Sequence, residues 1–212
     1  MNQSIALVLC ALTAVILTGC DFELDGDIKV AQTLTLKNDK NKAVTMVPGA
    51  YKTEVEYKKK KNRLELDLKV NGKKQEFLFA LPAGFEFPKK GGSFVIPAQV
   101  SGQPLDFGGH LTVAESDSEE MSGYESCSYQ TYGWTCDDRG NCYYGSITQS
   151  GSQEVHYYYH YTTYDLDAAL LPSGQSTHMA TVAGVKRESE KVYTYYGECR
   201  YCLLYTSDAA DE

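Results

Sequence analysis

The segment YKTEVEYKKKKNRLELDLKVNGKKQEFLFAL, residues 51–81, contains the clearest structural pattern in the chain. Apolar and charged side chains alternate from Tyr51 and again from Leu64, which is the period of a strand with one buried face. Asn71-Gly72 then precedes a third run. This dipeptide favours a two-residue hairpin, because both positions of a type I′ turn require positive φ. The segment therefore predicts three consecutive antiparallel strands.

Shorter runs with the same period extend this pattern in both directions. Strands are expected at residues 27–36, 43–47, 93–96, 105–114, 128–135, 142–149, 153–166, 178–185 and 191–197, and one helical turn at 166–171. Because turn signals separate these runs every few residues, the predicted fold class is all-β, with two antiparallel β-sandwich-like modules.

Composition changes at residues 115–123, an acidic, Ser-rich segment that we expect to be a linker. It separates a predicted first domain, 28–114, from a second, 124–201, which contains 14 of the 17 tyrosines. Charge divides in a similar way, since residues 28–90 carry a net +8 and residues 91–201 a net −9. The lysines at 58–61 are expected to be solvated edge residues, with contact to anionic lipid headgroups as the alternative.

The first nineteen residues contain no charged side chain, and their apolar core is too short to cross a bilayer. They end in Leu17-Thr18-Gly19-Cys20, which resembles the lipobox of bacterial lipoproteins, although no Lys or Arg precedes the apolar core. The resemblance implies that residues 1–19 are a cleaved signal peptide and that Cys20 carries lipid, with palmitate among its chains. The short acidic segment that follows is expected to make 20–27 a tether. It places the protein in the bacterial cell envelope, lipid-anchored at the periplasmic face or the cell surface, with inner and outer membrane both open.

Residues 202–212, CLLYTSDAADE, resemble the translation of a transposase-end adapter from short-read sequencing libraries. We expect this segment to be an artefact that is foreign to the protein. The fold is therefore sought between Cys20 and Tyr201.

Four cysteines lie in the second predicted domain, at Cys127, Cys136, Cys142 and Cys199. An even number in an exported chain predicts two disulfides, with three possible connectivities. The turn-forming pentapeptide between Cys136 and Cys142 favours a bond between these two, which leaves Cys127–Cys199. A zinc site is the alternative, but no two of these four cysteines form a CxxC pair.

Several function classes lack support in the sequence. A net charge of −8 argues against a nucleic-acid partner. Because the chain has no nucleophile-elbow, zincin, dinucleotide or phosphate-loop motif, we expect no catalytic residue and no cofactor. His156 and His160 have a spacing that suits metal on a helix. On the expected strand they lie about 13 Å apart, which is too far to share an ion.

Tyrosine is the unusual residue of this chain, with 17 against 7 Phe and 1 Trp. Its ring and hydroxyl suit protein recognition and stacking on sugars, whereas cross-strand packing is the alternative role. The candidate binding surface comprises Trp134, Tyr143, Tyr144, Tyr157, Tyr159 and Tyr161.

The expected function is that of a non-catalytic binding or structural module held at the membrane by its N-terminal lipid. The expected partner is another envelope protein or a polysaccharide. One alternative is a periplasmic enzyme such as a metal-dependent hydrolase that uses His156 and His160. A second alternative is an envelope assembly factor that acts by β-strand addition.

Overall fold

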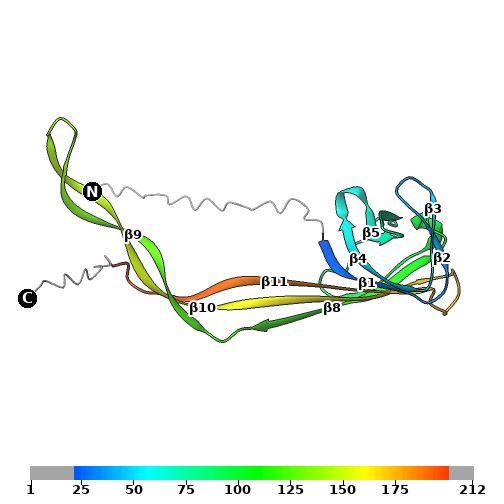
Figure 1. Ribbon diagram of the computed structural model, residues 1–212. Helices are drawn as coiled ribbons and strands as arrows, with labels where there is room; N and C mark the ends of the chain where they lie inside the picture. Colours follow the sequence, from blue (N-terminus) through cyan, green and yellow to red (C-terminus); the bar gives the residue numbers. More distant parts are fainter. Residues whose placement is uncertain (1–21, 201–212) are drawn as a thin grey trace, which may run out of the picture. The chain divides into compact units, whose positions relative to one another are not determined.

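The computed structural model describes residues 22–200. The expected signal peptide at 1–19, the expected lipidation site Cys20 and the adapter-like residues 202–212 lie outside the described residues. Within the described part, the chain forms almost only strands, which confirms the predicted all-β class (Figure 1). The strands are β1 Phe22–Val30, β2 Leu34–Lys37, β3 Ala43–Met46, β4 Gly49–Lys58, β5 Arg63–Val70, β6 Lys73–Ala80, β7 Gly92–Ile96, β8 Asp106–Asp117, β9 Met121–Cys136, β10 Cys142–Leu171 and β11 Ala180–Tyr196, with short helices η1 Lys59–Lys61 and α1 Ala98–Ser101.

The described residues divide into two compact units. Unit 1 comprises the residues up to Thr112 together with Tyr164–Lys186, and unit 2 comprises Val113–Thr163 and the residues from Arg187 onward. The predicted boundaries at 28–114 and 124–201 differ from this division, because β8, β10 and β11 each contribute residues to both units. Because these strands run through both units, the change of composition at 115–123 does not divide the chain into two consecutive domains.

Two segments that were expected to be irregular are strands. Residues 22–27 of the expected tether begin β1, where buried Phe22 and Leu24 alternate with exposed acidic residues. The expected linker at 115–123 contains the end of β8 and the start of β9. Acidic composition suggested loops in both places. In β1, however, the acidic side chains occupy the solvent positions of a strand, and at the end of β8 residues 115–117 are all exposed.

Unit 1 is a curved antiparallel sheet in which β6, β5, β4, β1, β11, β10, β8 and β7 follow one another (Figure 1). Phe77, Phe79 and Phe107 are fully buried in its apolar interior. The β2–β3 pair forms a second small sheet, to which Leu36 and Met46 contribute fully buried side chains. This part of the chain therefore has an ordinary hydrophobic core.

The hairpin at the centre of the sequence pattern forms as predicted. β5 and β6 pair from Arg63↔Ala80 to Val70↔Lys73. Asn71 and Gly72 have φ of 51° and 75°, so both turn positions are left-handed, as a type I′ turn requires.

Unit 2 contains the end of β8, all of β9 and the adjoining parts of β10 and β11, and its described strands belong to one sheet. This single layer differs from the sandwich-like second module that we expected. The separate strands expected at 142–149 and 153–166 are one 30-residue strand, β10, which also includes the expected helical turn at 166–171. The segment has too few aliphatic residues to fill the space between two layers.

No helix in the described part of the chain is long and apolar enough to span a membrane.

Candidate functional site

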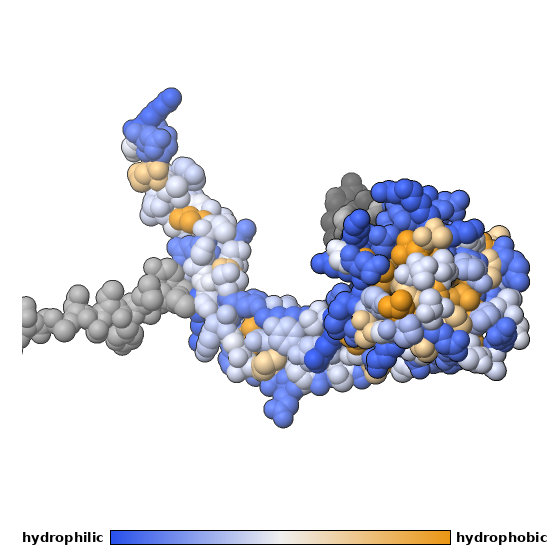
Figure 2. Space-filling model, turned by 45° about the vertical axis from the view of Figure 1, so that its right-hand side comes forward, coloured by the Kyte–Doolittle hydropathy of each residue, from blue (hydrophilic) through white to orange (hydrophobic). Residues whose placement is uncertain are grey.

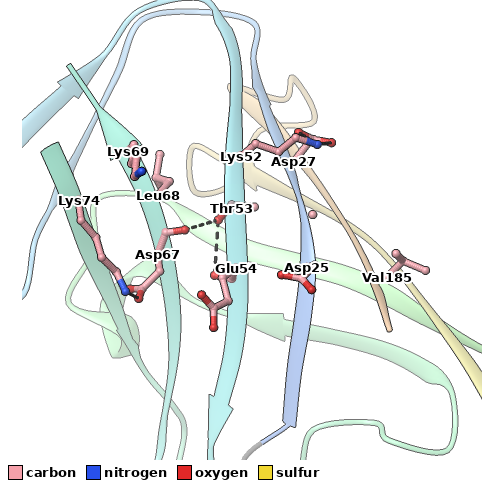
Figure 3. A pocket seen from close by; sticks show the side chains of 11 residues that line it. Asp25, Asp27, Lys52, Thr53, Glu54, Asp67, Leu68, Lys69, Lys74 and Val185 are labelled. Atoms are coloured by element: carbon pink, nitrogen blue, oxygen red, sulfur yellow. Dashed lines mark hydrogen bonds and ion pairs between the residues drawn. The ribbon is translucent and has the colours of Figure 1, made fainter. Parts of the chain in front are cut away.

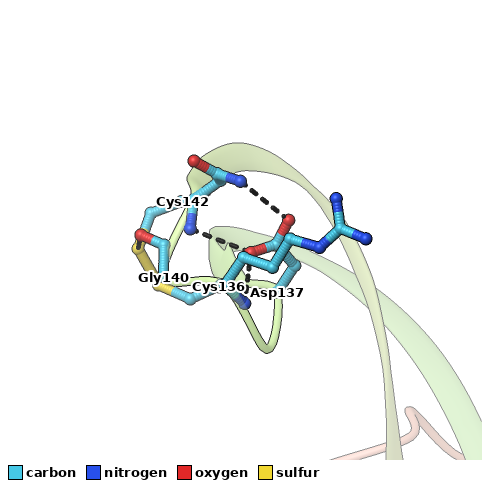
Figure 4. Close-up of a disulfide and its surroundings, with 6 residues drawn as sticks. Cys136, Asp137, Gly140 and Cys142 are labelled. Carbon is cyan, nitrogen blue, oxygen red and sulfur yellow. Dashed lines mark hydrogen bonds between the residues drawn. A yellow bond between two sulfur atoms is a disulfide. The ribbon is translucent and has the colours of Figure 1, made fainter.

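Both predicted disulfides are present, and they brace unit 2 at two places. Cys136–Cys142 joins directly paired residues at the end of the β9–β10 hairpin (Figure 4). Cys127–Cys199 links β9 to the segment after β11. Gly151 leaves room for this link, because a Cβ at that position would lie 2.4 Å from the Arg200 carbonyl oxygen and 3.2 Å from Cys199 Sγ.

The loop between Cys136 and Cys142 is organised by Asp137. Its carboxylate accepts hydrogen bonds from the backbone N–H groups of Arg139 and Asn141, at 3.0 and 2.9 Å, and from the Asn141 side chain at 3.1 Å (Figure 4). These bonds, first that of the Asn141 side chain, lower the pKa of Asp137. The loop is thus a self-contained turn, as predicted, in which both carboxylate oxygens of Asp137 already accept hydrogen bonds.

A cluster of exposed aromatic rings lies beside this disulfide on one face of the hairpin. Trp134 and Tyr144 are direct cross-strand partners with ring centroids 5.6 Å apart, and Tyr132 stacks on Tyr144 at 6.4 Å. Their exposed fractions are 70% for Trp134, 61% for Tyr144 and 72% for Tyr132. Three adjacent rings of this size in solvent form the tip cluster, a surface patch that internal packing does not explain.

The ribbon beneath the tip cluster carries no charge. Residues 126–136 and 142–153 contain no Asp, Glu, Lys or Arg, although such residues make up 23% of the whole chain. Around Tyr132 the same face presents Gln130, Ser146 and Thr148. Figure 2 shows this ribbon largely in pale colours, with deep blue at the end of the hairpin.

Of the six predicted surface residues, only Trp134 and Tyr144 belong to the tip cluster. Tyr143 is 60% exposed, but alternation along β10 directs it to the opposite face of the hairpin. Tyr157, Tyr159 and Tyr161 form a separate row on β10, with centroid separations of 5.9 and 6.3 Å, and all three are half-buried. This row corresponds to the alternative role, in which tyrosines pack along a sheet.

Cations from β11 cover that row. Lys191 Nζ lies 3.8 Å from the Tyr157 ring centroid, and Arg187 Cζ lies 4.0 Å from that of Tyr161. Lys191 also donates a 2.6 Å hydrogen bond to Glu125 of β9. In a single-layer sheet, long side chains of this kind shield the rings that a second layer would otherwise cover.

Glu125 is the acceptor at the centre of this network. The Tyr193 hydroxyl donates to the same Glu125 oxygen at 2.5 Å. The bond from Lys191, followed by that from Tyr193, lowers the pKa of Glu125, and the bond to Glu125 raises the pKa of Lys191 and of Tyr193. The network thus connects β9 to β11 across β10.

His156 and His160, the two histidines considered as metal ligands, have separate carboxylate partners. His160 Nδ1 lies 2.7 Å from Asp117, which raises the pKa of His160, while His156 lies 3.7 Å from Glu120 and 3.5 Å from Glu154. Among residues 22–200, no three His, Cys, Asp or Glu side chains are placed to hold one metal ion.

A second polar surface lies on unit 1, where the sequence predicted no site. The strand register places Asp25, Glu54, Asp67 and Glu76 opposite one another in a row across β1, β4, β5 and β6. The first three line an open hollow (Figure 3). Lys74 Nζ lies 2.7 Å from Asp67 Oδ2, whereas the buried Oδ1 of Asp67 has no hydrogen-bond donor among the described residues. Only the pairing register shows that these carboxylates are neighbours.

Neighbouring carboxylates raise the pKa of Glu54. A hydrogen bond with the Glu23 carboxyl, followed by partial burial, raises the pKa of Glu54 to about 7. A proton shared between two carboxyl groups lowers the repulsion that both would experience when ionised. Glu54 therefore titrates near neutrality.

Comparison with known proteins finds no matching family model, curated protein or solved structure for this chain.

Proposed function

We propose that the protein is a lipid-anchored lipoprotein of the bacterial cell envelope whose unit 2 is a non-catalytic binding module. The lipobox-type tetrad ending in Cys20 supports the anchor, and two disulfides agree with an oxidising compartment. The tip cluster is the observation that carries the binding role. It presents three large rings on a hairpin closed by a disulfide.

The chemistry around the tip cluster favours a neutral polysaccharide as the ligand. Tyr132 and Tyr144 have an interplanar angle of 24°, so their faces form a platform on which sugar rings can stack. Gln130, Ser146 and Thr148 supply amide and hydroxyl groups for hydrogen bonds to sugar hydroxyls. Because no charged side chain lies on this part of the ribbon, an acidic or basic polymer has no ionic partner there.

Binding can be followed through Trp134, since it is the single tryptophan of the chain. A soluble neutral β-glucan is expected to change Trp134 fluorescence in a saturable way, and alginate is not. Tyr144→Ala is expected to weaken binding about tenfold. Tyr195→Ala removes a similarly exposed ring outside the tip cluster and serves as the control.

Three results would contradict the binding proposal: no response to the glucan, an equal response to alginate, or an equal loss in the Tyr195 variant. The anchor is tested separately by palmitate labelling in cells. Cys20→Ser is expected to abolish labelling, and persistent labelling would exclude Cys20 as the lipid site.

A further inference from the structure

The edges of the described sheet differ in how well they are protected from pairing with another chain. β6 carries Lys73 and Lys74, and Asn38 and Asp39 of the same unit contact its backbone at Phe77 and Glu76. β7 has five residues and is followed by Pro97. Lysines, coverage and short length are three ways in which natural sheets protect an edge.

The unit 2 portions of β8 and β11 are charged. β8 ends with Glu115 and Asp117, and residues 186–191 of β11 read KRESEK. Among residues 22–200, nothing pairs with the outer edge of β9, and most of the strand is uncharged. Within the described residues it pairs with β10 alone, and its stretch 126–136 contains no charged residue and no proline.

In the described part of the chain, the outer half of the hairpin also has no third strand beside it. The segment following β11 meets β10 through Gly197 at Glu154 and through Arg200 at Ser152. Beyond Ser152, the described hairpin consists of β9 and β10 only. A two-stranded ribbon is marginal in water, whereas three or four strands give a stable sheet.

We propose that β9 pairs antiparallel with β9 of a second copy of this chain, about a twofold axis near Gln130. Such a pair joins two hairpins into one four-stranded sheet. A second copy is the favoured occupant because a symmetric contact places identical segments opposite each other. Like charges would oppose such pairing, and this edge is free of them although the chain carries a net −8.

The register is set by the proposed axis at Gln130. A twofold axis perpendicular to the sheet pairs even-numbered residues with even-numbered ones, so Ser128 lies opposite Tyr132 of the second copy, and Gln130 lies opposite Gln130. Both tip clusters then lie on the same face of the joined sheet. This pairing uses the backbone of β9, and the proposed polysaccharide binding uses side chains, so either can fail without the other.

The test is the mass of the mature chain in solution, measured by light scattering up to about millimolar concentration, the range that tethered partners experience. A dimer is expected, with slower amide hydrogen exchange in residues 126–135 as concentration rises. Gln130→Lys is expected to weaken the dimer at least tenfold, as is Gln130→Glu. Mixing the two variants is expected to restore a dimer, because opposite charges then face each other.

Thr148→Lys is the matched control, since Thr148 is the β10 partner of Gln130 and lies one strand away from the edge. It is expected to leave the dimer intact. A chain that stays monomeric throughout this range would overturn the proposal. So would a dimer unaffected by both Gln130 variants, or one weakened equally by Thr148→Lys. Circular dichroism of each variant establishes that the monomer remains folded.

Discussion

Gly26 of β1 lies so close to Ala183 of β11 that a Cβ on Gly26 would stand 1.9 Å from the Ala183 carbonyl oxygen. Gly109 of β8 is in a similar position, since its Cβ would lie 2.4 Å from that of Ala168. Both glycines lie within strands of unit 1, where the sheet curves. Glycine within a strand commonly marks such a close approach or bend.

Gly26→Ala is therefore expected to destabilise unit 1 by about 1–3 kcal/mol, because the neighbouring backbone must move to admit the methyl group. Urea denaturation measures this loss. Gly145→Ala is the control, since the nearest atom to its Cβ would be a Tyr143 ring carbon at 3.6 Å. Its effect is expected to stay within about 0.5 kcal/mol. Equal stability of the Gly26 variant and the unmodified protein would contradict the crowding.

Glu54 should make stability depend on pH between about 4.5 and 7. Its pKa in the folded chain is raised to about 7 from 4.5, so the folded state holds a proton that the unfolded state releases. The stabilisation is fully present below about pH 4.5 and is lost as pH rises through 7. Glu54→Gln is expected to be about as stable as the unmodified protein at pH 4 and relatively more stable at pH 8.

Denaturation at a series of pH values tests this difference, and Glu86→Gln, an exposed loop substitution with the same charge change, is the control. If the difference in free energy of unfolding between the Glu54 variant and the unmodified protein is the same at every pH in this range, the shared proton is excluded.

Local pattern predicted those features in which neighbours in sequence are also neighbours in space. The Asn71-Gly72 hairpin and the Cys136–Cys142 bond are of this kind, because each joins segments separated by a short turn. The Cys127–Cys199 bond followed only by elimination. Two of the three residues of the tip cluster, Trp134 and Tyr144, were predicted from the sequence, and Tyr132 was not.

The features that the sequence did not predict depend on pairings between distant segments. The row of Asp25, Glu54 and Asp67 exists only through the register of β1, β4 and β5. Lys191 and Glu125 are 66 residues apart and meet across β10. Alternating side chains give the faces of each strand but not the identity of the neighbouring strand.

The two disulfides should contribute unequally to stability. Their sequence separations are 6 for Cys136–Cys142 and 72 for Cys127–Cys199. Loop-closure entropy then predicts about 2 kcal/mol for the first and about 4 kcal/mol for the second. Paired Cys→Ser variants, compared by denaturation, are expected to follow this order. A larger loss of stability on removal of Cys136–Cys142 would show that loop-closure entropy is not the main contribution of these disulfides.

Lys191→Met tests whether the Glu125 network holds β9 to β11. The variant keeps an unbranched side chain but loses the ammonium that contacts Glu125, Tyr157 and Tyr193. Amide hydrogen exchange is expected to become faster in residues 121–126 and 191–196 and to stay unchanged in β4 and β5. Arg200→Met removes a more exposed ion pair of the same unit, that with Glu198, and is expected to change little.

The effect of Lys191→Met on amide exchange should also depend on pH, and the lowered pKa of Glu125 determines in which direction. Because the pKa of Glu125 is lowered in the folded chain, its stabilisation is present above the ordinary glutamate pKa and is lost as pH falls through the lowered value. The difference in exchange between Lys191→Met and the unmodified protein, corrected for intrinsic rates, is therefore expected to shrink between pH 6 and pH 3. If the difference instead persists at pH 3, the contact of Lys191 with the tyrosine rings, which needs no carboxylate, is what holds these strands together.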